Sequence, residues 1–375
     1  MDALTTPSNW QRVRLGDVGK PCMCKRVMKH QTTPYGEIPF YKIGTFGNTA
    51  DAFISKKLFL EYKTKYSFPK KGDILISASG TIGRAVIYDG KPAYFQDSNI
   101  VWIDNDETLV KNDFLFYAYS NIKWNTEHTT ILRLYNDNFR NTLIPLPPLN
   151  EQIAIANILS DLDRYLYALR ALILKKESVK KALSFELLSQ RKRLKGFNQA
   201  WQRVRLGDIC EITTGSLDAN EMVHYGKYRF YTCAKEYYFI DKYAFDTEAI
   251  LISGNGAYVG YVHYYKGKFN AYQRTYVLDN FSEHIMFVKY FLTMFLQSHI
   301  QTNKNEGNTP YIVMATLKDF EILLPPLNEQ IAIANILSDL DSEIISLKNK
   351  KRQFDNIKKA LNHDLMSAKI RVLKK

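Results

Sequence analysis

Cysteine and long apolar runs are scarce in this chain, and both absences narrow its class. Four cysteines among 375 residues are too few for a disulfide framework. No stretch of 18 uncharged apolar residues is available for a membrane-spanning helix, and residues 1–17 lack the apolar core of a secretory signal. We therefore expect a cytoplasmic protein with reduced cysteines and no membrane partner.

Motifs for metal and nucleotide binding are also missing. Cys22 and Cys24 stand near His30, but no second cysteine pair follows at zinc spacing. The chain contains no Walker A sequence for a nucleotide phosphate. We therefore expect no metal and no cofactor in this chain.

Two patterns typical of catalysis on DNA are incomplete. A carboxylate-lysine nuclease needs Pro-Asp before Glu-x-Lys to hold magnesium, and Glu61-Tyr-Lys63 supplies only the second half. Residues 308–311, Asn-Thr-Pro-Tyr, resemble the N-P-P-Y loop of amino-methyltransferases, but Thr309 replaces the first proline. No Gly-rich loop for S-adenosylmethionine stands upstream of it. We predict no catalytic residue.

Acidic residues are fewer than basic ones. The chain has 51 Lys and Arg against 38 Asp and Glu, a net charge of +13, which favours a polyanionic partner. The excess is uneven, because residues 18–146 sum to +5 and residues 209–324 to −2. With 46% apolar residues, the chain can fill buried cores, and its length fits two or three domains.

The chain is a tandem duplication. The opening segment WQRVRLGD occupies residues 10–17 and recurs at 201–208. The closing segment LPPLNEQIAIANILSDLD occupies residues 146–163 and recurs at 324–341. A repeat of this kind indicates two copies of one architecture. Between the segments lie two variable stretches, the first body (about residues 18–145) and the second body (about 209–323).

Both bodies are predicted to be α+β domains. Short β-branched and aromatic runs, broken by glycine and charged turns, predict strands, and residues 114–122 and 285–299 are predicted to be helical. The bodies are related, since YGEIPFY at 35–41 matches YGKYRFY at 225–231. DILISASGTIG from Asp73 likewise aligns with AILISGNGAYVG from Ala249.

Each closing segment predicts a long helix. Two prolines end the preceding structure, Asn150 and Asn328 are the expected N-caps, and a glutamate follows in the first turn. About 40 residues give a helix of about 60 Å. Apolar residues then recur in the 4,3 rhythm of a coiled-coil seam: Ile155, Leu159, Leu162, Leu166 and Leu169, and in the second copy Ile333, Leu337, Leu340, Ile344 and Leu347. We expect the two helices to pair as an antiparallel coiled coil with pseudo-two-fold symmetry; the alternative is that each packs only on its own domain.

These residues resemble a known family. Openings of the form W-x-x-V-x-L-G-[DE], closings of the form L-P-P-L-x-E-Q-x-x-I-A, and two divergent bodies between them are similar to the specificity subunit of type I restriction-modification systems. The resemblance covers residues 10 to about 370. It implies two tandem target-recognition domains that each read half of a bipartite DNA sequence. It also implies paired helices that set the spacing between the half-sites.

The resemblance further implies that the chemistry belongs to partners. The expected partners are double-stranded DNA, two copies of the modification (methyltransferase) subunit and, through the complex, a restriction subunit. S-adenosylmethionine, ATP and Mg are expected in those subunits. The implied domains are residues 1–146 and 196–324 for recognition, 147–195 for the first helix and linker, and 325–375 for the second helix and tail. The alternative function is a stand-alone DNA-binding or scaffolding regulator built from the same domains.

Three segments in each body carry residue types suited to reading bases, and we predict DNA contacts there. Arginine suits guanine, amides suit adenine, and glycine lets the backbone approach closely. The alternative is that these residues only form strand turns and loop caps. The candidates in the first body are Ser77, Ser79, Gly80, Thr81, Arg84, Gln96, Asn99, Thr130 and Arg133, and those in the second are Ser253, Asn255, Gly256, Tyr258, Gln273, Arg274, Asn308 and Thr309.

Overall fold

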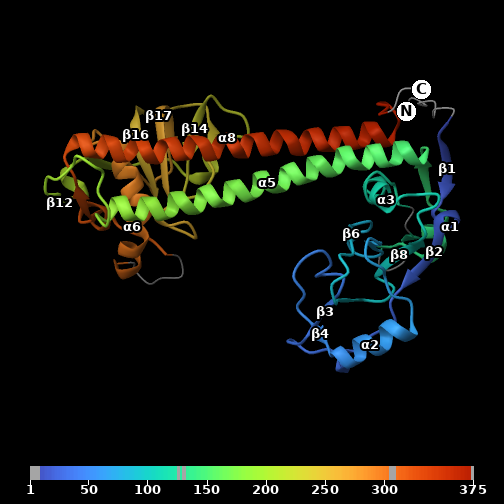
Figure 1. The fold of residues 1–375 in the computed structure, drawn as a ribbon. Coiled ribbons are helices and arrows are strands. Elements are labelled where there is room, and N and C mark those ends of the chain that lie inside the picture. Colours follow the sequence, from blue (N-terminus) through green and yellow to red (C-terminus); the bar gives the residue numbers. More distant parts are fainter. Residues whose placement is uncertain (1–8, 125–126, 129–131, 304–309, 373–375) are drawn as a thin grey trace. The chain divides into compact units, whose positions relative to one another are not determined.

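The computed structural model describes residues 9–124, 127–128, 132–303 and 310–372. The chain forms two compact units, one combining Met1–Leu169 with Lys350–Lys375 and the other comprising Arg170–Asn349. Each unit therefore contains one body and part of each of the two long helices. Figure 1 shows both units as a ribbon coloured along the sequence.

Among its described residues, the first unit contains a four-stranded sheet, a three-stranded sheet and two two-stranded sheets. Its strands are β1 (Gln11–Arg14), β2 (Gly19–Met23), β3 (Ile38–Tyr41), β4 (Phe53–Ile54), β5 (Ile74–Ser77), β6 (Ala85–Ile87), β7 (Tyr94–Phe95), β8 (Ile100–Asn105), β9 (Glu127–His128), β10 (Leu132–Arg133) and β11 (Leu143–Leu146). Its short helices are α1 (Leu15–Val18), η1 (Lys29–Gln31), α2 (Lys56–Lys65), α3 (Asn112–Tyr119) and α4 (Asn136–Asn141). The sheet orders are β2-β8-β5-β6 and β4-β3-β7, while β1 pairs with β11. Every residue of the apolar run in β5 is buried, as expected for an inner strand.

The second unit contains one six-stranded sheet in the order β13-β18-β16-β17-β14-β15. Its strands are β12 (Gln202–Arg205), β13 (Glu211–Thr214), β14 (Tyr228–Tyr231), β15 (Tyr238–Ile240), β16 (Phe245–Ser253), β17 (Val262–Ala271), β18 (Thr275–Asp279) and β19 (Glu321–Leu324). Its short helices are η2 (Leu206–Asp208), η3 (Ala219–Glu221), α6 (Ile285–Asn303) and α7 (Met314–Lys318). Apolar residues of β16 and β18 share one core with α6, and β12 pairs with β19 as β1 pairs with β11. The predicted α+β class is confirmed for both bodies.

Two long helices complete the units. They are α5 (Leu149–Leu188) and α8 (Leu327–Met366), each of 40 residues, and they run side by side in green and red in Figure 1. Both begin one residue before the predicted caps. Asn150 and Asn328 therefore lie inside the first turn, where each side-chain oxygen accepts from the next backbone N–H at 2.9 Å. The predicted caps are wrong by this shift.

Contacts in each unit show that the helices pair antiparallel. In the first unit Lys358 Nζ lies 2.5 Å from Asp163 Oδ1. In the second unit Lys176 Nζ lies 2.8 Å from Glu343. Early residues of α5 thus meet late residues of α8, and late residues of α5 meet early ones of α8. The predicted antiparallel pair is confirmed, and the alternative that each helix packs only on its own domain is wrong.

The predicted seam residues lie in two kinds of surroundings. Those nearest the helix starts are buried within the cores of the bodies: Ile155 and Leu159 in the first, Ile333 and Leu337 in the second. Farther along, buried residues lie outside those core clusters: Leu166, Leu169 and Ile344. The remaining three are partly buried: Leu162, Leu340 and Leu347. The first turns therefore anchor each helix to its body, and the later turns serve the helix pair.

Replacing Leu166 by alanine should loosen the helix pair and leave both bodies folded. A buried leucine truncated to alanine lowers stability by about 2–5 kcal/mol, because a cavity remains. Hydrogen exchange should therefore accelerate in α5 and α8 and stay unchanged in β5 and β16. Ile345→Ala is the control, since Ile345 lies on α8 with its side chain 58% exposed. Equal acceleration in both variants would contradict the assignment.

A buried glutamate ties the start of α5 to both ends of the first unit's sequence. Glu151 is 2% exposed and accepts a hydrogen bond from Trp10 Nε1 at 3.0 Å. Arg371 donates to the two oxygens of the same carboxylate at 2.7 and 3.0 Å. The bidentate geometry and the charge make these strong hydrogen bonds.

The second unit repeats this arrangement with the equivalent residues. Glu329 is fully buried and accepts from Trp201 Nε1 at 3.2 Å. Arg193, which follows the end of α5, donates to it at 3.1 and 2.5 Å. We call each set a Trp-Glu-Arg clamp. The tryptophan of each opening segment therefore donates to the glutamate in the first turn of the following long helix, and this contact is the same in both copies.

Candidate nucleic-acid interface

The three predicted segments of the first body meet at Ala78, in the loop after β5. The Ala78 N–H donates to the Asn99 carbonyl at 2.8 Å, and its own carbonyl accepts from the Leu134 N–H at 2.8 Å. The Gly-rich loop, the segment before β8 and the end of β10 thus form one surface.

The second body builds the same junction around Gly254. Its N–H donates to the Arg274 carbonyl at 2.8 Å, and its carbonyl accepts from the Ile312 N–H at 2.9 Å. A Cβ on Gly254 would collide with the Arg274 carbonyl and approach the Tyr276 ring to 2.9 Å, so glycine permits this close approach. The two bodies share a backbone frame and differ in the side chains on it.

Some predicted residues of the first body stabilise this frame. Ser77 and Ser79 are buried; the Ser77 hydroxyl bonds the Thr81 carbonyl, and Ser79 donates to Asn99 Oδ1 at 2.9 Å. Gly80 and Thr81 are exposed at the tip of the loop. Thr130 lies outside the described residues.

The longer side chains of the first body also have internal partners. Arg84 is exposed and donates to the Phe46 carbonyl at 2.9 Å, while Arg133 donates to the Ser98 carbonyl at 3.0 Å. Gln96 accepts from the Ile43 N–H at 2.9 Å. These bonds fix where the side chains stand.

The second body presents more exposed groups at its junction. Tyr258, Gln273 and Arg274 are exposed, and Gln273 Nε2 donates to Asp218 at 2.7 Å. Asn255 and Gly256 are partly exposed in the same loop. Ser253 is instead fully buried, and its hydroxyl has no hydrogen-bond partner among the described residues. Asn308 and Thr309 lie outside the described part of the chain.

The loop after the first parallel strand of each body is a fourth segment at this surface, which sequence reasoning missed. In the first body, Ile43 in this loop bonds Gln96. In the second body, Lys235 Nζ lies 5.1 Å from the centre of the Tyr258 ring, a cation–π contact. The related YGEIPFY and YGKYRFY segments immediately precede these loops and were the available signal.

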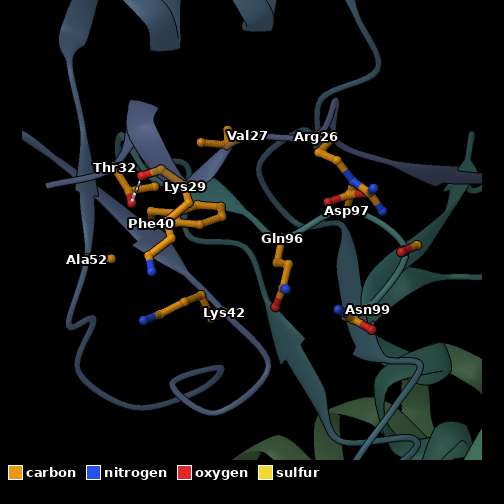
Figure 2. A pocket seen from close by; sticks show the side chains of 11 residues that line it. Arg26, Val27, Lys29, Thr32, Phe40, Lys42, Ala52, Gln96, Asp97 and Asn99 are labelled. Atoms are coloured by element: carbon orange, nitrogen blue, oxygen red, sulfur yellow. Dashed lines mark hydrogen bonds and ion pairs between the residues drawn. The ribbon is translucent and has the colours of Figure 1, made fainter. Parts of the chain in front are cut away.

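A hollow of about 470 Å³ opens beside the junction of the first body. Residues from four stretches of the chain line it, as Figure 2 shows: Arg26, Val27, Lys29, Thr32, Phe40, Lys42, Ala52, Gln96, Asp97, Ser98 and Asn99. Its only carboxylate among the described residues, Asp97, lies 2.8 Å from Arg26 Nε. The hollow therefore keeps a basic character.

Side chains that could suggest catalysis have ordinary partners. Glu61 pairs with Lys65 at 3.0 Å, one helical turn away on α2. Burial raises the pKa of the Cys24 thiol to about 12, so that this thiol stays protonated at neutral pH. Within the described ranges, no group of three His, Cys, Asp or Glu side chains is arranged to hold a metal ion. The same ranges contain no helix with the length and apolar character that a bilayer crossing requires.

Comparison with known proteins shows where such a frame occurs. The model of the type I restriction modification DNA specificity domain matches residues 7–177 and 198–354. A putative type I restriction enzyme specificity subunit of Haemophilus influenzae is 62% identical over 40% of this chain, and the EcoDI specificity subunit of Escherichia coli is 38% identical over 44%. These alignments span 40% and 37% of the two relatives, so the chain matches about two fifths of their length. The crystal structure of a type I restriction-modification S subunit from M. genitalium has the same fold, with a TM-score of 0.67, 18% identity and 97% coverage of both chains.

Proposed function

Because the chain belongs to the family of the type I restriction modification DNA specificity domain, we propose that it directs a restriction-modification complex to a bipartite DNA sequence. In this proposal residues 1–146 and 196–324 are the two target-recognition domains, each reading one half-site. Residues 147–195 and 325–375 supply the helices that hold them. The chain itself recognises DNA and leaves the reactions to its partners.

The two equivalent junctions carry this proposal. Ala78 and Gly254 make the same two backbone hydrogen bonds, yet the residues displayed around them differ. A constant frame with variable side chains suits two readers of different base sequences, since base edges are distinguished by side-chain donors and acceptors. We place DNA contacts on the loops that meet at these junctions.

Exposed residues shared by the two copies support two identical partners. The opening segments expose Gln11, Arg12 and Arg14, and again Gln202, Arg203 and Arg205. The helix starts expose Leu149 and Ile153, and again Leu327 and Ile331. Identical surfaces suit two copies of one protein. We propose that two methyltransferase subunits bind there, and that a restriction subunit joins through the resulting complex.

The cofactors of the proposed reaction belong to those partners. The methyltransferase would use S-adenosylmethionine to modify the N6 amino group of adenine, and the restriction subunit would use ATP and Mg. The proposed site of action is the cytoplasm.

Co-expression with any methyltransferase subunit encoded beside this chain tests the proposal. The full chain should purify with two copies of that subunit, and the complex should methylate adenine in one bipartite sequence, which sequencing of the methylated DNA identifies. The variant Ile153→Asp with Ile331→Asp should lose the partner, because it places charge on both shared apolar surfaces. Specific DNA binding without any methyltransferase complex would instead favour the stand-alone regulator.

A further inference from the structure

The hollow of the first body holds two side-chain amides whose orientation is set by their neighbours. The Ile43 N–H can only donate, so the atom of Gln96 that faces it at 2.9 Å is the carbonyl oxygen. The guanidinium of Arg133 can only donate as well, and it lies 3.5 Å from the amide oxygen of Asn99, which also accepts from Ser79 at 2.9 Å. Both amide oxygens therefore accept hydrogen bonds from within the protein.

The opposite atoms of the same amides remain available. Neither Gln96 Nε2 nor Asn99 Nδ2 has a hydrogen-bond partner among the residues that the structure describes. In Figure 2 Asn99 turns its nitrogen toward Gln96, and both amides lie at the hollow. Each amide thus offers N–H donors to whatever enters.

The cations of the hollow add a further donor. Arg26 is paired with Asp97, and Lys42 lies 2.8 Å from Asp51, but Lys29 has no ion pair within the described ranges. The Thr32 hydroxyl already donates to the Lys29 carbonyl at 2.8 Å. The side-chain N–H donors of the hollow without a partner among the described residues are therefore those of Lys29, Gln96 and Asn99.

We propose that this hollow takes the major-groove edge of a guanine, whose O6 and N7 both accept hydrogen bonds. The inference rests on the proposed function and names the base chemistry that the first body reads. Adenine presents one acceptor and one donor, so an amide that reads it must offer both an N–H and a free oxygen. Here the oxygen of Asn99 already accepts from two donors, Ser79 and Arg133, which removes the usual reason for pairing this amide with adenine.

A phosphate oxygen is also purely an acceptor, but the second body argues against it. Gln96 donates its N–H to the Tyr41 carbonyl and Tyr272 donates to the Tyr231 carbonyl, both at 2.9 Å, so Gln96 and Tyr272 are equivalent. By the junction bonds, Asn99 corresponds to Arg274. Phosphate contacts carry no sequence information and need not differ between bodies, whereas these positions differ completely.

Two isosteric variants test the donor chemistry. Asn99→Asp and Gln96→Glu keep the oxygens that accept from Ser79, Arg133 and Ile43, and replace the free amino group by a second oxygen. The full chain, in complex with its methyltransferase, would be used to select bound sequences from a pool of random duplex DNA. For the wild type we expect a guanine in one half-site; in each variant its preference should fall about ten- to hundredfold, with cytosine gaining because its N4 amino group donates. The other half-site should not change.

Modified DNA separates the two acceptors. Substituting 7-deazaguanine for that guanine should weaken the wild type about tenfold and leave unaffected the variant that has already lost the amino group reading N7. A second DNA carries an uncharged analogue in place of one backbone phosphate. If this replacement abolishes the difference in DNA affinity between wild type and variant, the hollow binds a phosphate, and the guanine assignment is overturned. Asn48→Asp is the control, because it adds the same charge at an exposed position of the same body outside the hollow.

The outcomes keep the two proposals apart. If both variants select the wild-type motif and bind it with wild-type affinity, the guanine inference is overturned, while the proposal of DNA recognition stands. A wild-type complex that enriches no motif would contradict the proposed function itself.

Discussion

Removal of Arg193 is expected to destabilise the second unit by about 3–5 kcal/mol, because it leaves the fully buried carboxylate of Glu329 without its charged partner. Trp201 alone would then face the charge with a single N–H at 3.2 Å. Urea unfolding of Arg193→Ala, followed by hydrogen exchange in β16 and β18, measures the loss. Arg371→Ala should affect the first unit in the same way, since Arg371 holds Glu151.

A neighbouring lysine supplies the control for this prediction. Lys192 pairs with Glu186 at 2.7 Å, but its side chain is 68% exposed, and such a surface pair contributes about 0–1 kcal/mol. Lys192→Ala should therefore unfold close to the wild type. The clamp assignment fails if Arg193→Ala and Lys192→Ala lose the same stability, or if Arg371→Ala destabilises the second unit rather than the first.

Sequence patterns predicted the long helices well and the clamps not at all. The apolar rhythm of the closing segments depends only on neighbours along one helix, so it could be read locally. For Glu151 the sequence predicts only a charge in the first helical turn, because its partners, Trp10 and Arg371, stand 141 and 220 residues away. No periodic signal links residues at such separations, and a single sequence shows no covariation.

In the candidate site, too, some features can be predicted from the sequence and others cannot. The alignment of SASGTIG with SGNGAYVG located the loops, because the glycines and small residues needed for a close backbone approach are visible as letters. Ser77 and Ser79 were expected at DNA, but the structure buries them in the frame. The free amino groups of the hollow could not be predicted, since they depend on which atoms of Ile43 and Arg133 face each amide.

Exchange of the first body is the prediction with the largest effect on function. Replacing residues 18–145 by the corresponding body of another specificity subunit should change every base read in one half-site and none in the other. The reason is that each junction is built entirely from its own body, around Ala78 in one and Gly254 in the other. Sequencing of the methylated DNA provides the readout, and altered bases in both half-sites would contradict independent readers.

The contact between each body and its helix sets the condition for a clean exchange. Tyr117 donates to Asp163 of α5 at 2.8 Å, and Tyr290 donates to Asp341 of α8 at the same distance. An incoming body with a tyrosine at position 117 should therefore pack on α5 as the native body does. Both Asp163 and the Trp10-Glu151-Arg371 clamp lie outside the exchanged residues and remain unchanged. With Tyr117→Phe in the exchanged body, the complex should read the same new bases, because the loops at the junction are unaltered. It should methylate them more slowly, because the lost hydrogen bond to Asp163 loosens the contact between the body and α5. If this variant reads different bases, base choice depends on the helix contact as well, and the body is not an independent reader.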